Sequence, residues 1–403
     1  MNHSELHYYN EIDCVQMLGI PLSFEEDEGS SVDREDDDVS ALSKKYENIN
    51  LFGNSETQKE NFFESLPEEV IQLILLYLDT ASLCNLASTC RLLHQHCYDR
   101  LLYKELDLQP YWPNIKDSSL ESLTSRCRKL ERINLSWCGG HNFISFNAFN
   151  KFLLNLEKNL IVLRLSGCEF LNDNCFDAIC SNCPKLEELN IASCINTNEF
   201  SPLVRLNKLK KLNLYRTNID YFSLYQFIMK CSSLEHLNIG SCSTLRNCGD
   251  IVVKLSNNCR NLKGLDIWRA KDITSLSINS LAECKQLEEL DIGWCKVESN
   301  CGCLRKLAEN CRKMKKLFLT ATRTVSDLDL QTIAKYCPQL EQFDILGTTE
   351  VTLGGIKLIL DKCENLQLLD ISFCEEINGK IYLDLVKQYP HVNIKKSFQS
   401  DDL

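Results

Sequence analysis

A short alternation of apolar and polar positions recurs along most of the chain. Residues 284–295 read CKQLEELDIGWC, and close copies begin at Cys127, Cys183, Cys231 and Cys363. Within each copy a leucine or isoleucine returns at every second position, which is typical of a short strand with one buried face. The segments between copies, such as SLESLTSRC and LQTIAKYC, carry apolar residues at helical spacing instead. The pattern predicts a unit of one strand followed by one helix.

The unit repeats at a nearly constant spacing of 23 to 30 residues. This spacing and the Leu-x-Leu strand resemble the cysteine-containing leucine-rich repeats. The resemblance implies an α/β solenoid, a horseshoe of parallel strands and helices, because no single unit can bury its apolar face without its neighbours. We expect the solenoid to span residues 105–403 and to end in a C-terminal cap. The apolar residues that mark the strands are Leu135, Leu165, Ile191, Leu214, Ile239, Ile267, Ile292, Leu319, Ile345 and Ile371, with Leu108 and Ile394 as degenerate first and last members.

The chain has 23 cysteines, and most of them fall into two columns of the repeat. One column ends the predicted helices. The other follows the predicted strands, where Thr217, Ala270, Thr322 or Thr348 replaces cysteine in some copies. Free cysteine behaves as a small apolar side chain, and alanine could not replace a metal ligand, so we interpret both columns as buried packing positions. The columns are Cys127, Cys183, Cys231, Cys259, Cys284, Cys311, Cys337 and Cys363, and Cys138, Cys168, Cys194, Cys242, Cys295 and Cys374.

Residues 62–104 show a different pattern, which predicts three short helices. The first has Ser65 as a candidate cap and Pro67 as a first-turn residue. The Leu-Pro-x-Glu start and the apolar helix after it resemble the F-box. In F-box proteins these positions dock the Skp-family adaptor of a Skp–cullin–F-box ubiquitin ligase, by a helix-in-groove contact; the alternative is that they only pack the domain's own core. The resemblance assigns adaptor binding to Leu66, Pro67, Glu69, Val70, Ile74, Leu75, Leu78 and Leu83.

An F-box followed by cysteine-containing repeats is the arrangement of the F-box leucine-rich-repeat family. One member that this chain resembles carries a discoidin-like β-sandwich before its F-box and is associated with mitochondria. Residues 8–20, YYNEIDCVQMLGI, resemble the closing strand of that sandwich, so we expect residues 1–20 to be a poorly ordered remnant of a missing domain. Residues 21–61 are predicted to be a disordered acidic linker, because residues 25–38 hold nine acids and one arginine.

The sequence shows few signs of catalysis. It has no Gly-rich phosphate loop, no His-Glu-x-x-His and no Gly-x-Ser-x-Gly. A catalytic cysteine ligase would need an activated thiolate with a basic neighbour, and no position stands out. We predict a non-catalytic chain with no cofactor and no metal. Two groups have spacings that a metal could use, although packing explains both better: Cys90, His94, His96 and Cys97 in one, and Cys295, Cys301 and Cys303 in the other.

The outward positions of the predicted strands offer a binding surface. Side chains alternate along a strand, and the position between the two apolar residues is usually Asn or Asp, which favours a partner with basic or amide donors. The next outward positions vary and hold aromatic residues and arginines, the composition of binding hot spots. The alternative is that these rings cap neighbouring loops. The predicted substrate-binding residues are Trp137, Tyr215, Arg216, Trp268, Arg269, Asp291, Trp294, Phe318 and Phe373.

Together with the family resemblance, these features predict the substrate-recognition subunit of a Skp–cullin–F-box E3 ubiquitin ligase. The F-box binds the adaptor and through it the cullin complex. The concave face and the C-terminal end of the solenoid bind a target protein for ubiquitination and proteasomal degradation. The resemblance adds mitochondrial outer-membrane proteins, mitophagy receptors among them, as targets. The alternative is a leucine-rich-repeat binding scaffold or inhibitor outside any ligase.

Net charge and hydropathy bear on two further classes of partner, nucleic acids and membranes. A net charge of -12 and an isoelectric point near 5.2 argue against a nucleic-acid partner. No apolar run reaches the roughly 18 residues of a membrane span, so no direct membrane insertion is predicted. Neither a secretory signal nor an Arg-rich leader is visible. We expect a cytoplasmic protein that, by the resemblance, lies peripheral to mitochondria.

Overall fold

The computed structural model of the chain describes residues 62–298 and 301–397. It divides the chain into two compact units, one that ends at Leu102 and one that begins at Tyr103. The predicted strand remnant at 1–20 and the predicted acidic linker at 21–61 lie outside the described residues. Each unit is considered by itself below.

The described part of the first unit, residues 62–102, is a small helical domain. Its three α-helices form where the apolar spacing predicts them, and one face of each contributes to a common core of Ile71, Leu75, Leu83, Leu93 and Cys97. The start of the first helix differs from expectation, since Pro67 is its N-cap and Ser65 closes a preceding 3-10 turn. The second helix is capped by Asp79, which accepts from the backbone N–H of Ser82 at 2.7 Å. The elements are η1 (Phe62–Ser65), α4 (Glu68–Leu75), α5 (Thr80–Ala87), α6 (Arg91–Cys97) and η2 (Arg100–Tyr103).

The second unit is a single parallel sheet in which every strand pairs with the strand of the next repeat. Each strand is three residues long and pairs in register with its neighbours, as Leu290 does with Leu265 and Leu317. The α/β solenoid predicted from the repeat is therefore confirmed. The strands are β1 (Glu105–Asp107), β2 (Arg132–Asn134), β3 (Val162–Arg164), β4 (Glu188–Asn190), β5 (Lys211–Asn213), β6 (His236–Asn238), β7 (Gly264–Asp266), β8 (Glu289–Asp291), β9 (Lys316–Phe318), β10 (Gln342–Asp344), β11 (Leu368–Asp370) and β12 (Asn393–Lys395).

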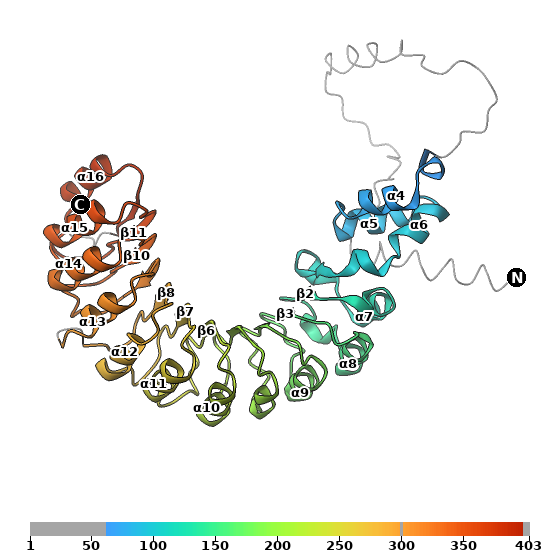
Figure 1. Cartoon of the computed structure of the whole chain (residues 1–403), viewed down its shortest axis with the longest axis horizontal. Coiled ribbons are helices and arrows are strands. Elements are labelled where there is room, and N and C mark those ends of the chain that lie inside the picture. The colour runs from blue at the N-terminus through green and yellow to red at the C-terminus, as the bar shows by residue number, and fades with distance from the viewer. Residues whose placement is uncertain (1–61, 299–300, 398–403) are drawn as a thin grey trace, which may run out of the picture. The chain divides into compact units, whose positions relative to one another are not determined.

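Helices cover the outer side of this sheet, and the strands line the inner side of its curve (Figure 1). The α-helices are α7 (Asp117–Thr124), α8 (Phe146–Asn155), α9 (Asp173–Asn182), α10 (Tyr221–Lys230), α11 (Cys248–Asn258), α12 (Ser275–Leu281), α13 (Cys303–Asn310), α14 (Asp327–Tyr336), α15 (Leu353–Lys362) and α16 (Gly379–Gln388). Between β4 and β5, where the marker residues are only 23 apart, the 3-10 helix η6 (Ser201–Arg205) takes the place of an α-helix. The other 3-10 helices are η3 (Gln109–Asn114), η4 (Cys127–Lys129) and η5 (Gly140–Asn142).

The strands lie slightly earlier in each repeat than the marker residues suggest. In β8 the strand ends at Asp291, and the marker Ile292 follows it, still fully buried. The last marker departs from this rule, because Ile394 pairs with Leu369 and is itself a strand centre. Ile394 is therefore equivalent to Leu369 rather than to Ile371, and Lys396 stands at the position that the marker residues hold in the other repeats.

The two cysteine columns are buried, as predicted, and they also join consecutive repeats. In the post-strand column the thiol of Cys295 lies 3.2 Å from the carbonyl oxygen of Ile267 one repeat earlier, and Cys194 lies 3.0 Å from Leu165 in the same way. In the helix-end column the thiol of Cys311 lies 3.4 Å from the carbonyl oxygen of Cys284. A buried thiol at these positions both fills a slot and gives a carbonyl a weak donor.

Removing one of these buried thiols should cost stability. We expect Cys295→Ala to lower the free energy of unfolding by about 1 kcal/mol, because a sulfur-sized space is left behind and the carbonyl of Ile267 keeps only one of its two donors, the backbone N–H of Ala270. Cys301→Ala makes the same chemical change at an exposed cysteine in the same loop and should stay within about 0.5 kcal/mol of wild type. Urea denaturation followed by circular dichroism under reducing conditions measures both. Equal effects of the two changes would contradict the packing role.

Candidate functional site

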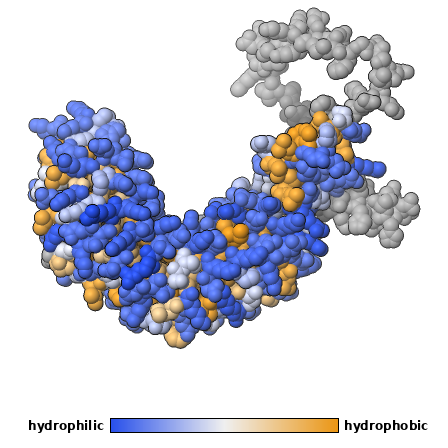
Figure 2. Space-filling model, in the orientation of Figure 1, coloured by the Kyte–Doolittle hydropathy of each residue, from blue (hydrophilic) through white to orange (hydrophobic). Residues whose placement is uncertain are grey.

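The helical unit presents a row of apolar side chains that its own core does not use. On α4 and in the turn after it, Leu73, Leu76 and Tyr77 are 56%, 60% and 84% exposed. Figure 2 shows hydrophobic residues gathered on this unit. An exposed apolar patch of this kind marks an interaction surface more often than chance.

The structure divides the residues predicted for adaptor binding. Leu75 and Leu83 are buried in the unit's own core, so they are not available on its surface. Leu66 and Leu78 pack against that core and are half-buried. The remaining four, Pro67, Glu69, Val70 and Ile74, are exposed.

Sequence reasoning missed Leu73, Leu76 and Tyr77, although a signal for them was present. The helix carries two apolar stripes, and the stripe through Ile71 and Leu75 was the one matched to helical spacing. A second stripe on so short a helix cannot be buried by the same core, because opposite faces of one helix point in opposite directions. The second stripe therefore belongs to the surface.

The inner face of the repeat unit is hollowed over the strands β4 to β9. The hollow has a volume of about 350 Å³. Its floor includes His236 of β6, whose ring lies where a side chain on Gly264 of β7 would stand. Burial and the nearby Lys211 lower the pKa of His236. Phe318 and Asp291 close the hollow at the β8–β9 end.

The Asn/Asp column, which lines part of this hollow, also stabilises the turns that follow the strands. In each of these repeats the side-chain oxygen accepts from the backbone N–H two residues later, as Asp291 Oδ1 does from Gly293 at 2.8 Å and Asn238 Oδ1 does from Gly240 at 2.9 Å. This Asx-type turn ends the strand. The column is therefore explained first by the fold. Only the second polar atom of each side chain, an oxygen in Asp and an amide nitrogen in Asn, is left to serve a partner, and in Asp266 this oxygen already accepts from Asn238 Nδ2.

Of the aspartates at the centre of the column, Asp291 is the least compensated, because Asp266 accepts a further bond from Asn238 Nδ2 at 2.7 Å and Asp344 one from the Thr320 hydroxyl at 2.8 Å. Asp266 and Asp291 are cross-strand neighbours, and Asp344 lies two strands further along, beyond Phe318. Burial raises the pKa of Asp291 to about 7, and the charges of Asp266 and Asp344 add to the effect. Asp266 and Asp344 have raised pKa values for the same first reason. A positively charged or amide group placed here would relieve this desolvation.

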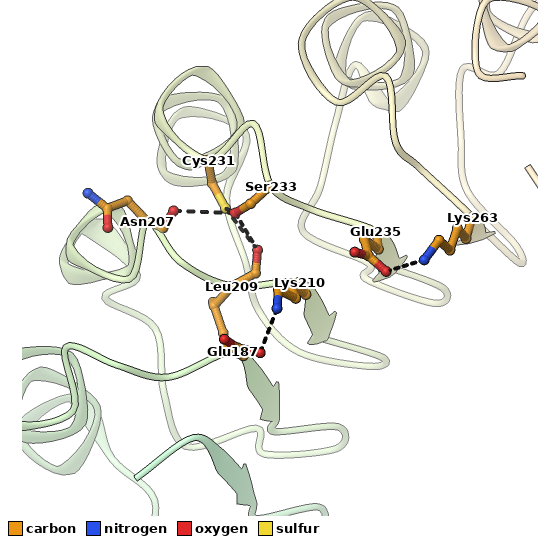
Figure 3. A network of polar contacts seen from close by, with 8 residues as sticks. All are labelled: Glu187, Asn207, Leu209, Lys210, Cys231, Ser233, Glu235 and Lys263. Carbon is orange, nitrogen blue, oxygen red and sulfur yellow. Dashed lines mark hydrogen bonds and ion pairs between the residues drawn. The ribbon is translucent and has the colours of Figure 1, made fainter. Parts of the chain in front are cut away.

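Most of the lysines at the rim are paired with glutamates. One residue before each of the strands β4 to β10, glutamate and lysine alternate from repeat to repeat, and neighbouring repeats form ion pairs (Figure 3). Lys210 lies 2.8 Å from Glu187, and Lys263 lies 2.7 Å from Glu235. These pairs are partly exposed, so each adds little stability, but together they neutralise the rim. The central aspartates remain outside this ladder.

Aromatic rings and one arginine form a ledge next to the hollow. The ring centres of Tyr215 and Trp268 are 6.3 Å apart. The guanidinium of Arg269 lies 4.3 Å from the ring centre of Trp268 and 5.8 Å from that of Trp294. Trp268 also lies against Gly293 of the next repeat, where a Cβ would come within 2.9 Å of its ring. These rings thus pack partly against neighbouring repeats and are partly exposed to solvent.

The bulky residues that follow the strands occupy an unusual backbone conformation. Arg216, Arg269 and Trp294 have φ values of 55°, 58° and 58°. The repeat imposes this left-handed turn, because each of these N–H groups donates to a carbonyl of the next repeat, as Trp294 does to Thr320 at 2.8 Å. Glycine fits this conformation without strain, and Gly167 holds it in another repeat. A tryptophan or arginine here costs about 1 kcal/mol or more relative to glycine, so the backbone alone does not explain these side chains.

The structure brings most of the predicted substrate-binding residues together and leaves two apart. Residues on β5 to β9 and in their turns form one surface, which we call the inner ledge: Tyr215, Arg216, Trp268, Arg269, Asp291, Trp294 and Phe318. Trp137 follows β2 and Phe373 follows β11, each separated from the ledge by at least one further strand. Both are exposed, 53% and 42%. Phe318 differs from expectation, because it stands in the Asn/Asp column itself, level with Asp291.

The histidine and cysteine groups do not form a metal centre in the described part of the chain. Cys97 belongs to the core of the helical unit, and His94 Nδ1 lies 3.1 Å from the carbonyl oxygen of Ala87. None of the helices in residues 62–298 and 301–397 is long and apolar enough to cross a membrane.

Comparison with known proteins bears on both units. Residues 63–109 match the F-box-like family model. F-box/LRR-repeat protein 4 of Bos taurus is 40% identical over 414 residues, which cover 99% of this chain and 66% of that protein. F-box protein SKIP19 of Arabidopsis thaliana is 30% identical over 132 residues, which cover 32% of this chain and 42% of that protein. The chain thus spans about two thirds of the bovine relative and less of the plant one.

A solved structure supports the same fold. The crystal structure of the Rad7 and Elc1 complex in yeast contains a chain that superimposes with a TM-score of 0.53 at 17% identity, covering 92% of this chain and 98% of that one. At this identity the likeness speaks for the fold alone.

The pKa of Asp291 predicts a specific pH dependence. Because burial raises the folded-state pKa, the folded protein holds a proton that the unfolded chain releases, and stability falls as the pH rises from about 4 to about 7. Asp291→Asn keeps the turn, since Asn213 and Asn238 accept the same bond, but it cannot ionise. The variant should gain stability over wild type across this range and keep a constant advantage above it. The gain cannot exceed about 4 kcal/mol, at about 1.4 kcal/mol per tenfold change in proton affinity.

Asp220→Asn is the matched control for this measurement by urea denaturation. Burial acts to raise the pKa of Asp220, but hydrogen bonds from Ser223 and neighbouring amides outweigh it and lower the pKa. Stability contributed by Asp220 is therefore lost only as the pH falls below about 4. Between pH 5 and 8 its difference from wild type should be flat. A flat difference for Asp291→Asn as well would show that Asp291 is ionised normally.

Proposed function

The chain belongs to the F-box and leucine-rich-repeat family, and from this premise we propose that it is a substrate-recognition subunit of a Skp–cullin–F-box ubiquitin ligase. The helical unit binds the Skp-family adaptor, and the inner ledge of the repeat unit binds a target protein. The chain itself does not catalyse the transfer of ubiquitin. It holds the target near the ubiquitin-loading enzyme and raises the effective concentration of the reacting groups.

The observation that carries this proposal is the exposed apolar face of α4 within the segment that matches the F-box model. A helix with an open apolar stripe is suited to docking on a complementary groove. Val70 and Ile74 extend the stripe formed by Leu73, Leu76 and Tyr77. Pro67 and Glu69, also exposed, stand at the start of the same helix. Leu75 and Leu83 are left out of this surface, because they hold the unit together.

Two properties of the inner ledge support it as the target site, its rigid backbone and the chemistry of its side chains. The strands of the inner ledge are fixed on both sides by neighbouring strands, so its side chains are pre-organised, which lowers the entropic cost of binding. Aromatic and arginine side chains make up most of the inner ledge, as they do in binding hot spots. The desolvated pair Asp266 and Asp291 favours a target segment that carries lysine, arginine or amide donors. We propose proteasomal degradation as the outcome, and mitochondrial outer-membrane proteins as candidate targets.

Adaptor binding is tested with the purified chain and a purified Skp-family adaptor. Leu76→Ala with Tyr77→Ala should weaken binding at least about tenfold, or about 1.4 kcal/mol, because the pair removes the most exposed part of the apolar face. Leu154→Ala is the control, since Leu154 is an equally exposed leucine, 61%, on α8. Isothermal titration calorimetry gives the affinities.

The outcome separates the ligase subunit from the scaffold alternative. No binding of the adaptor by wild type would leave a leucine-rich-repeat scaffold or inhibitor as the better description. Binding that the double variant and the Leu154 variant retain alike would place the adaptor contact somewhere other than on the α4 face.

Target binding is tested at the left-handed position after β8. Trp294→Gly removes the ring and relieves backbone strain, so the melting temperature should stay the same or rise. Ala321→Gly changes the same backbone position in the next repeat, with φ of 59°, and removes only a methyl group. Proteins that crosslink to the adaptor-bound chain and become ubiquitinated are compared by quantitative mass spectrometry. Their loss with Trp294→Gly, but not with Ala321→Gly, is expected; unchanged crosslinking in both would exclude Trp294 from the site.

A further inference from the structure

The loop after β8 brings two thiols to one backbone carbonyl. The Sγ atoms of Cys301 and Cys303 lie 3.2 and 3.6 Å from the carbonyl oxygen of Glu298. Only Gly302 separates the two cysteines, and its φ of 82° and ψ of 14° give a left-handed turn. Helix-like dihedral angles of either hand bring the flanking Cα atoms to about 5.4 Å, which lies inside the range of about 4.4 to 6.8 Å found in disulfides.

The two thiols have opposite environments. Cys301 is exposed, whereas Cys303 begins α13 with no exposed surface. A hydrogen bond from the Ser275 hydroxyl is the main reason that the pKa of Cys301 is lowered. Burial raises the pKa of Cys303 to about 12, and its hydrogen bond with the Cys301 thiol adds to this. An exposed nucleophilic thiol beside a protected second thiol is the arrangement that thiol–disulfide exchange requires.

The guanidinium of Arg305 adds a positive charge to this turn. A Cβ on Gly302 would come within 2.9 Å of Arg305 Nη2, so the guanidinium lies directly against the residue between the two cysteines. Arg305 is held there by Asp329, 3.4 Å from its Nη1. The Asp329 carboxylate also acts on the second thiol, because its charge is one of the causes that raise the pKa of Cys303.

No other cysteine of the described residues combines these features. Apart from Cys90, which is half-buried, the others are buried. Cys295, six residues before Cys301, is typical: burial raises its pKa to about 12. Thiolate chemistry in the described chain is thus concentrated at one turn.

We propose that Cys301 and Cys303 form a reversible dithiol–disulfide switch that exchanges with small-molecule disulfides such as glutathione disulfide. The Cys301 thiolate attacks one sulfur of glutathione disulfide, forms a mixed disulfide and releases one glutathione thiolate. The Cys303 thiol, as it loses its proton to that thiolate or to water, attacks the Cys301 sulfur and releases the second glutathione. The protein is oxidised by two electrons, and one glutathione disulfide becomes two glutathiones. Excess thiol reverses both steps.

The full-length chain, reduced and freed of thiols, is treated with glutathione disulfide and measured by intact and peptide mass spectrometry. Wild type should lose the mass of two hydrogens, with Cys301 joined to Cys303. Cys303→Ser should instead keep a glutathione adduct on Cys301, formed about tenfold or more faster than on any other cysteine of residues 62–298 and 301–397. Cys301→Ser should show neither product.

Two further comparisons keep the test decisive. Cys303→Ala should give the same persistent adduct as Cys303→Ser, which excludes an effect of a buried hydroxyl on folding, and circular dichroism confirms that both variants are folded. Cys295→Ser should behave like wild type. A wild-type chain that retains the adduct on Cys301 without closing an internal disulfide, or that is modified first at another described cysteine, would overturn the proposal.

Discussion

The hydrogen-bond ladder between consecutive repeats is the constraint on which the rest of this structure depends. Each strand contributes only three residues, so no repeat could hold its shape alone. The ladder continues past the strand, because the residue in the left-handed turn donates its N–H to the next repeat as well, as Trp294 does to Thr320. This extension fixes the backbone position of the residues in the turn, and with it the direction from which their side chains leave the backbone. The inner ledge is a consequence of backbone bonding before it is a consequence of side-chain chemistry.

The ladder also explains why polar and small residues repeat so strictly. An Asx turn ends most of the strands and turns the chain toward the next helix, and Asp291 and Asn238 serve it equally well. Either Asp or Asn can therefore form the turn. Which of the two is present decides the local charge. Asp266 and Asp291 side by side leave two poorly hydrated carboxylates where two asparagines would leave none. That difference has a cost in stability at neutral pH, and a partner that supplies donors can offset it.

Much of the fold could be predicted because its signals are local and repeated. Apolar alternation, helical spacing and the two cysteine columns recur often enough that each copy supports the others. The errors lie where a position depends on a neighbour in space. Ile394 was placed in the wrong column because the last repeat has a lysine, Lys396, at the marker position, and only the pairing of Ile394 with Leu369 reveals the shift. Leu75 and Leu83 fit the adaptor-binding pattern of the family, yet a three-helix unit needs them for its core.

The candidate site was harder to predict for the same reason. The sequence identified aromatic and arginine residues after the strands, but it could not show that Trp268 lies on Gly293 or that Arg269 lies between two tryptophan rings. Nor could it separate Cys301 from the buried cysteines, because exposure is a property of the folded loop.

In a solenoid each repeat contacts mainly its neighbours, so the effect of a substitution stays close to its own repeat. The α4 face, the aspartates of β7 and β8, and the Cys301–Cys303 turn lie on separate elements. A change at one of them leaves the backbone ladder under the others intact. Loss of adaptor binding, of target binding or of thiol exchange can therefore be assigned to the side chain that was changed rather than to general unfolding.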